Sequence, residues 1–131
     1  MRVLDIAVAA LALSAAMLAV AHAAVTAENF QLHTTGDLVA LCTVTRGESM
    51  AIAAIHFCEG FDVGVARTLQ SEDAARPNRR PLFCLPNPRP TRDEAATGFV
   101  QWARADQQRL SLPPADGVAN YLASTYPCSR S

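Results

Sequence analysis

Four cysteines constrain the fold of this chain more than any other feature of its sequence. They are Cys42, Cys58, Cys84 and Cys128, all downstream of an apolar N-terminal stretch. An even number of cysteines in a small exported domain is typical of paired disulfides, and four cysteines allow three connectivities, which the spacing leaves open. Each bridge is worth about 2–4 kcal/mol, a large share of the stability of a small domain.

The N-terminal stretch has the organisation of a secretory signal peptide. Arg2 provides a positive start, an almost unbroken apolar run extends from Ile6 to Val20, and Ala21-His22-Ala23 has the small residues of a cleavage site. The run is about 15 residues long, shorter than the roughly 20 that a membrane-spanning helix needs. Asp5 interrupts its start and leaves an uncleaved anchor as the alternative. We predict cleavage after Ala23, a single mature domain over residues 24–131, and no membrane attachment after cleavage.

The mature sequence predicts an all-α domain of four helices. They begin at Thr34-Thr35-Gly36-Asp37, near Glu48 or Ser49, at the capping box Thr91-Arg92-Asp93-Glu94, and at Ser111-Leu112-Pro113-Pro114. The second runs to about Leu69 or Gln70, and its apolar residues recur at spacings of three and four, which makes it the central helix. Residues 24–33 are predicted to be extended, and no stretch alternates long enough to demand a strand.

A proline-rich segment separates the second and third predicted helices. Its prolines, between residues 71 and 90, exclude a regular helix and predict an extended path. Arginines on and beside it can present planar donors to the carboxylates of a partner, and an exposed tryptophan nearby would suit an interface. The candidate contact residues are Arg79, Arg80, Arg89, Arg92 and Trp102. The alternative, which the residues alone favour, is a solvated loop balanced by neighbouring acids.

Two glycines lie one turn apart in the second predicted helix. Gly60 and Gly64 follow Cys58 in a stretch that otherwise favours helix. A glycine inside a helix costs about 1 kcal/mol relative to alanine, so two of them predict that another element packs closely against this face.

The sequence provides little that suits catalysis, metal binding or nucleic acid. His56 and Cys58 lie two residues apart and therefore on different faces of a helix, which does not suit a zinc site. A catalytic cysteine needs a free thiol, and four paired cysteines leave none. The formal net charge of −1 creates no strong field toward nucleic acid or an anionic membrane. We predict a binding protein rather than an enzyme, with no cofactor and no metal.

Short motifs follow one another in a fixed order along the mature chain. They are Thr35-Gly36-Asp37-Leu38 with Cys42, Cys58-x-Gly60-Phe61-x-x-Gly64, Cys84-x-Pro86, Tyr121-Leu122 and Tyr126-Pro127-Cys128. This ordered set resembles the Rap/Tai-type immunity proteins, which neutralise peptidoglycan amidases delivered by type VI secretion. The resemblance implies a periplasmic helical domain, commonly dimeric, that blocks the catalytic cleft of an amidase without chemistry of its own. It also implies that the four cysteines form disulfides and that Gly60 and Gly64 are packing positions.

The chain departs from the family pattern in two places. One is the arginine- and proline-rich insert around Cys84, and the other is Gln101-Trp102-Ala103, where relatives usually carry a Tyr-Leu-like pair. These departures leave the partner open, and the alternative function is a small periplasmic chaperone or stress-related helical binding protein with no amidase partner.

For the disulfides we predict the pairs Cys58–Cys84 and Cys42–Cys128. A tight hairpin would place Cys42 near the start of the second helix. Cys58 lies about ten residues into that helix, roughly 14 Å further along. A bridge between Cys42 and Cys58 is therefore awkward, which favours the other pairs.

Overall fold

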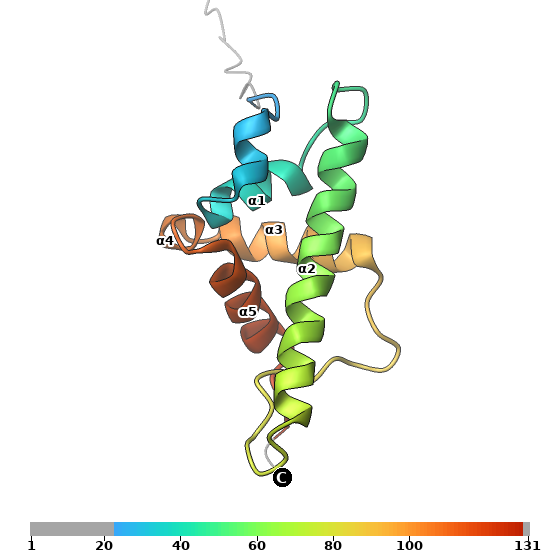
Figure 1. The fold of residues 1–131 in the computed structure, drawn as a ribbon, viewed down its shortest axis with the longest axis vertical. Coiled ribbons are helices and arrows are strands. Elements are labelled where there is room, and N and C mark those ends of the chain that lie inside the picture. The colour runs from blue at the N-terminus through green and yellow to red at the C-terminus, as the bar shows by residue number, and fades with distance from the viewer. Residues whose placement is uncertain (1–22, 130–131) are drawn as a thin grey trace, which may run out of the picture.

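A computed structural model describes residues 23–129 (Figure 1). The elements are a short 3₁₀ helix η1 (Ala27–Gln31) and the helices α1 (Thr35–Cys42), α2 (Ala51–Ala74), α3 (Arg92–Arg104), α4 (Gln107–Leu110) and α5 (Pro114–Thr125). Residues 23–129 contain no strand, so the predicted all-α class is confirmed. None of the described helices combines the length and the apolar character needed to cross a membrane. The predicted signal peptide, residues 1–23, lies outside the described residues except for Ala23.

The four predicted helices are present, and capping boxes explain where two of them, α1 and α3, begin. At α1, the Asp37 amide donates to the Thr34 hydroxyl, and the Thr34 amide donates to the Asp37 carboxylate at 2.9 Å. Thr91 and Glu94 exchange the same pair of bonds at α3. In each case two backbone donors without a helical partner are satisfied at once, which is why the helix begins there.

Two short helices were not predicted. The stretch expected to be extended contains η1, and the turn after α3 contains α4, where the Asp106 side chain accepts a bond from the Gln108 amide. Helices of a single turn carry too few residues for an apolar repeat, so local capping bonds are their main signal.

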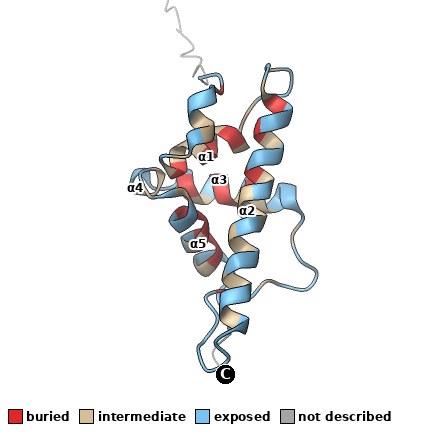
Figure 2. Ribbon diagram, in the orientation of Figure 1, coloured by how far each residue is buried: buried red, intermediate tan, exposed pale blue. Residues whose placement is uncertain are grey.

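The core lies where α1, α3 and α5 meet the first half of α2 (Figure 2). Phe99, Leu38 and Val118 are among its fully buried side chains. The only buried residues of α2 are Ala51, Ala54 and Cys58, so the rest of this long helix extends beside α5 with a half-buried face. This arrangement leaves room for a pocket between the middle of α2 and its neighbours.

The disulfides join Cys42 to Cys58 and Cys84 to Cys128, so the predicted pairing is wrong. The prediction assumed a tight hairpin after Cys42, whereas residues 43–50 form a longer connection before α2 begins. Consequently the end of α1 meets α2 two turns after its start, where the Cα atoms of Cys42 and Cys58 are 5.3 Å apart. The second bridge ties the proline-rich segment to the residues after α5, and the Cys84 amide donates to the Tyr126 carbonyl at 2.8 Å beside it.

Candidate functional site

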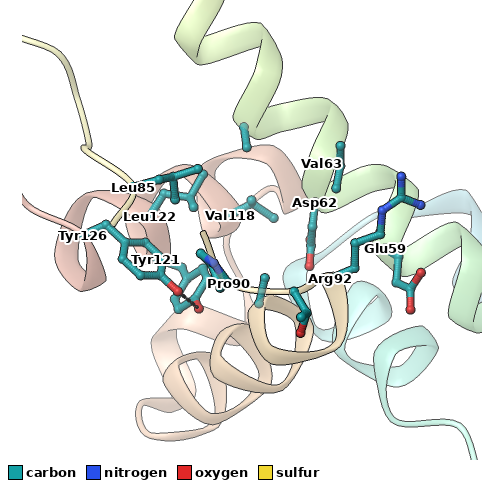
Figure 3. A pocket seen from close by; sticks show the side chains of 13 residues that line it. Glu59, Asp62, Val63, Leu85, Pro90, Arg92, Val118, Tyr121, Leu122 and Tyr126 are labelled. Carbon is teal, nitrogen blue, oxygen red and sulfur yellow. Dashed lines mark hydrogen bonds between the residues drawn. The ribbon is translucent and has the colours of Figure 1, made fainter. Parts of the chain in front are cut away.

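An apolar pocket lies between the middle of α2, the beginning of α3 and the second half of α5 (Figure 3). Its apolar walls are Val63, Ala66, Leu85, Pro90, Ala95, Val118 and Leu122. Leu85 and Pro90 come from the proline-rich segment, which closes one side. The pocket has a volume of about 110 Å³. An engineered protein cavity of about 150 Å³ holds a benzene molecule, so this pocket suits a group the size of one side chain rather than a nucleotide or a sugar chain.

Asp62 is the most unusual residue in the wall of this pocket. The side chain as a whole is half-buried, but both carboxylate oxygens are shielded from water, and neither has a hydrogen-bond partner among the described residues. Burial raises the pKa of this carboxyl from 3.8 to about 7. Buried polar groups are nearly always hydrogen-bonded and buried charges are nearly always paired, so this carboxylate calls for an explanation.

Asp62 is not among the site residues predicted from the sequence. It lies one turn after Cys58 on the stripe of α2 that faces the other helices. An ionisable residue at such a position interrupts the apolar repeat, and that interruption was the available signal.

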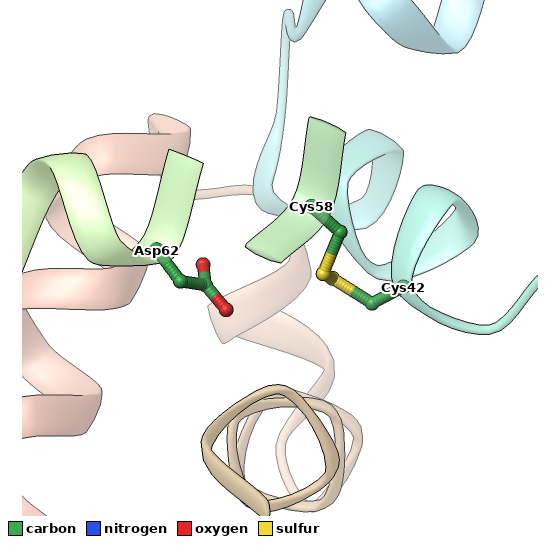
Figure 4. Close-up of side chains that lie close together, drawn as sticks. All are labelled: Cys42, Cys58 and Asp62. Atoms are coloured by element: carbon green, nitrogen blue, oxygen red, sulfur yellow. A yellow bond between two sulfur atoms is a disulfide. The ribbon is translucent and has the colours of Figure 1, made fainter. Parts of the chain in front are cut away.

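The Asp62 carboxylate also lies beside the Cys42–Cys58 disulfide (Figure 4). The two sulfur atoms and a carboxylate oxygen are all within 4.8 Å of one another, which is the spacing of metal ligands. Cysteine binds metals as the thiolate, and here the two sulfurs are bonded to each other. The oxidised trio therefore does not suit a metal ion.

Polar groups lie at both ends of the pocket (Figure 3). Glu59 and Arg92 lie at the same end of the pocket as Asp62. None of the ion pairs among the described residues includes Glu59 or Arg92. At the other end the hydroxyls of Tyr121 and Tyr126 are 3.4 Å apart. Burial, together with the contact with Tyr126, raises the pKa of Tyr121, so this hydroxyl stays protonated. The pocket is thus apolar along its length, and one end holds two carboxylates and one guanidinium, an excess of one negative charge when both acids are ionised.

The structure does not bring the five predicted contact residues together. Only Arg92 lines the pocket, and Arg89 lies in the exposed segment just before α3. Arg79 and Arg80 belong to the loop after α2, where Arg80 donates to the Cys128 carbonyl at 2.6 Å. Trp102 lies half-buried beside the core.

Trp102 is half-buried in an aromatic cluster, so only part of its ring is open to a partner. Its ring lies 6.5 Å from that of Phe99 and 6.2 Å from that of Tyr121. The Arg109 guanidinium lies 4.5 Å from the Trp102 ring centroid, a cation–π contact that covers part of the ring.

The predicted close packing at Gly60 and Gly64 is not found within the described chain. Both glycines are exposed, and a Cβ atom added at either would meet no atom within 4 Å. They line a shallow groove between α2 and the start of α5. The tight glycine contacts are elsewhere: a Cβ at Gly98 would overlap the Tyr121 hydroxyl, and one at Gly117 would overlap the Thr35 hydroxyl.

The chain matches the family model of the Rap1a immunity proteins over residues 34–128. No curated protein and no solved structure matches it. The matched region begins at the cap of α1 and ends at Cys128, so it contains both disulfides and every residue of the pocket wall.

Proposed function

Because the chain belongs to the Rap1a immunity protein family, we propose that it binds a type VI secretion peptidoglycan amidase effector and blocks its active-site cleft. The family match over residues 34–128 is the observation that carries this proposal. It covers well over half of the chain and includes α1 to α5 completely. In this function the protein is an inhibitor that contributes binding and no chemistry.

We place this activity in the periplasm, with residues 1–23 removed as a signal peptide. Two disulfides fit a protein that folds outside the reducing cytoplasm, and the four cysteines leave no free thiol. The periplasm is also where an enzyme that cuts peptidoglycan meets its substrate.

A rigid surface suits an inhibitor of this kind. Binding is tighter when fewer groups have to be ordered in the complex. The Cys84–Cys128 bridge and the buried Phe83 hold the proline-rich segment against the helices, so this segment can meet a partner in an already defined shape. Its exposed arginines, Arg79, Arg80 and Arg89, remain predicted contacts, together with Arg92 and Trp102.

A homodimer is also part of the proposal. The outer face of α2 carries Ile52, whose surface is 76% exposed, and Phe57 at 37%. Gly60 and Gly64 continue along the same helix and leave space in which a second backbone can approach. A second copy that covers these residues would remove apolar surface from water.

The test uses the cognate amidase effector, which we expect to be encoded beside the gene for this chain. Purified residues 24–131 should form a stable complex with that effector and abolish its hydrolysis of purified peptidoglycan at equimolar concentration. A strain without the gene should lyse when neighbouring cells deliver the effector, and a copy of the gene with its export signal should restore growth. The reduced and alkylated protein, whose two bridges are open, is the matched control and should not inhibit. A soluble, folded protein that neither binds the effector nor protects the strain would overturn the proposal.

A further inference from the structure

Among residues 23–129, the Asp62 carboxylate has no partner. Its two oxygens are buried without a hydrogen bond among the described residues, and no ion pair there includes it. Arg92 is the cationic residue of the same pocket wall, and it is exposed and not paired with Asp62. A carboxylate in such a place must stay protonated or obtain a cation from another molecule.

The pocket around Asp62 has the form of a site for a long apolar group that ends in a cation. Val63, Val118 and Leu122 form walls along its length, and at one end the two carboxylates of Glu59 and Asp62 outnumber the single cation of Arg92 (Figure 3). Lysine and arginine side chains have this composition, because an aliphatic stem carries the charged group. The volume of about 110 Å³ has room for one such side chain.

We propose that this pocket receives a lysine or arginine side chain of the protein that the chain binds. The cationic group of that side chain lies at the end of the pocket formed by Glu59 and Asp62. The aliphatic stem then lies between Val63 on α2 and Val118 and Leu122 on α5. The identity of the partner as the effector rests on the proposed function, whereas the chemistry of the pocket does not.

The two carboxylates at one end of the pocket favour a cationic occupant over an anionic or a purely apolar one. An anionic group would meet the two carboxylates of Glu59 and Asp62, and a purely apolar side chain would leave Asp62 without a partner. A cation attracts a carboxylate even without direct contact, because the surrounding apolar walls screen the charges much less than water does. The desolvation of Asp62 has already occurred on folding, so the further cost of hydration when the cation enters falls on the cation and on the half-buried Glu59.

The pocket can be tested without the effector by small probes. The n-butylammonium ion represents a lysine side chain, and n-butanol is a neutral molecule of the same length. In methyl NMR titrations at pH 7.5, n-butylammonium should shift the signals of Val63, Val118 and Leu122 with an affinity at least fivefold higher in the native protein than in Asp62→Asn. The affinity for n-butanol should be the same in both, which also shows that the pocket of the variant is intact.

Two further variants sharpen this test. Asp116→Asn removes an exposed carboxylate of α5 that lies outside the pocket wall, and it should bind n-butylammonium like the native protein. Arg92→Gln removes the cation of the wall and should retain or strengthen binding. Equal n-butylammonium affinity in the native protein and Asp62→Asn, or loss of binding in Arg92→Gln, would overturn the proposal.

The effector itself provides the second arm. Asp62→Asn should weaken its binding at least tenfold, whereas Asp116→Asn should change it less than twofold. Tight effector binding that Asp62→Asn leaves unchanged would overturn the pocket proposal while the immunity function stands. Failure of all variants and of the native protein to bind the effector would overturn the immunity function, and the result with n-butylammonium would then decide the chemistry of the pocket alone.

Discussion

Replacing Asp62 with asparagine should change how the stability of the protein depends on pH. Asparagine has nearly the shape of aspartate and cannot ionise. In the native chain the carboxyl is buried without a partner in the part of the chain that the structure describes, and burial raises its pKa to about 7 from 3.8. The folded protein therefore binds this proton more tightly than the unfolded chain does, so the contribution of Asp62 to stability is complete below pH 4 and is lost as the pH rises through 7.

The size of the effect follows from the two pKa values. A rise of the pKa from 3.8 to about 7 corresponds to about 4 kcal/mol of unfolding free energy between low and high pH, since each unit of pKa is worth about 1.4 kcal/mol. Between pH 5 and pH 8 we expect the native protein to lose about 2–3 kcal/mol of unfolding free energy. Asp37 acts outside this window: burial opposes its ionisation, but bonds from Thr34 and Asn29 lower its pKa, so its contribution is lost only as the pH falls below about 4.

Urea unfolding at pH 5, 6, 7 and 8, with both disulfides intact and Trp102 fluorescence as the signal, measures this dependence. Asp62→Asn should give a nearly flat profile and should be more stable than the native protein at pH 8 by about 1–3 kcal/mol, because the cost of burying an unpaired amide offsets part of the gain. Asp116→Asn, which changes an exposed carboxylate, should keep the native slope. A native protein equally stable at pH 5 and pH 8, or a slope that Asp62→Asn retains, would refute the reasoning.

Three further predictions concern the disulfides, the glycines and one buried hydroxyl. Replacing Cys84 and Cys128 with serine should cost about 4 kcal/mol of unfolding free energy, because this bridge closes a loop of 44 residues. Replacing Cys42 and Cys58 should cost about 3 kcal/mol, because that loop spans 16 residues. Peptide mapping of the unreduced protein that recovers a Cys58–Cys84 fragment would contradict the pairing. Gly60→Ala should raise the unfolding free energy by about 0.5–1 kcal/mol, since its Cβ meets open space. Gly117→Ala should lower it by about 1–3 kcal/mol, because its Cβ would overlap Thr35. Melting temperatures that shift in the same direction in both variants would argue against these contacts. Thr35→Val should lower the unfolding free energy by about 1–2 kcal/mol, because the Thr35 hydroxyl donates to the Leu112 carbonyl at 3.0 Å inside the core. An unchanged midpoint in urea unfolding would show that this bond contributes nothing.

Local patterns in the sequence determined the elements of this fold. The capping boxes at Thr34 and Thr91 specify where α1 and α3 begin, because their bonds join residues only three positions apart. The prolines between residues 71 and 90 exclude a helix wherever that segment lies. The even number of cysteines predicted two disulfides, and the ordered motifs identified the family that the match over residues 34–128 establishes.

The tertiary structure alone decided which of these elements meet. The pairing of Cys42 with Cys58 depends on where along α2 the end of α1 packs, and the connection at residues 43–50 is long enough for that contact to lie two turns into α2. Gly60 and Gly64 face open space, while Gly98 and Gly117 hold the close contacts, because contact depends on what lies opposite a helix face. Asp62 became recognisable as a site for the same reason. Its position in α2 is plain in the sequence, but its burial, with no partner among residues 23–129, results from the packing of α3 and α5 around it.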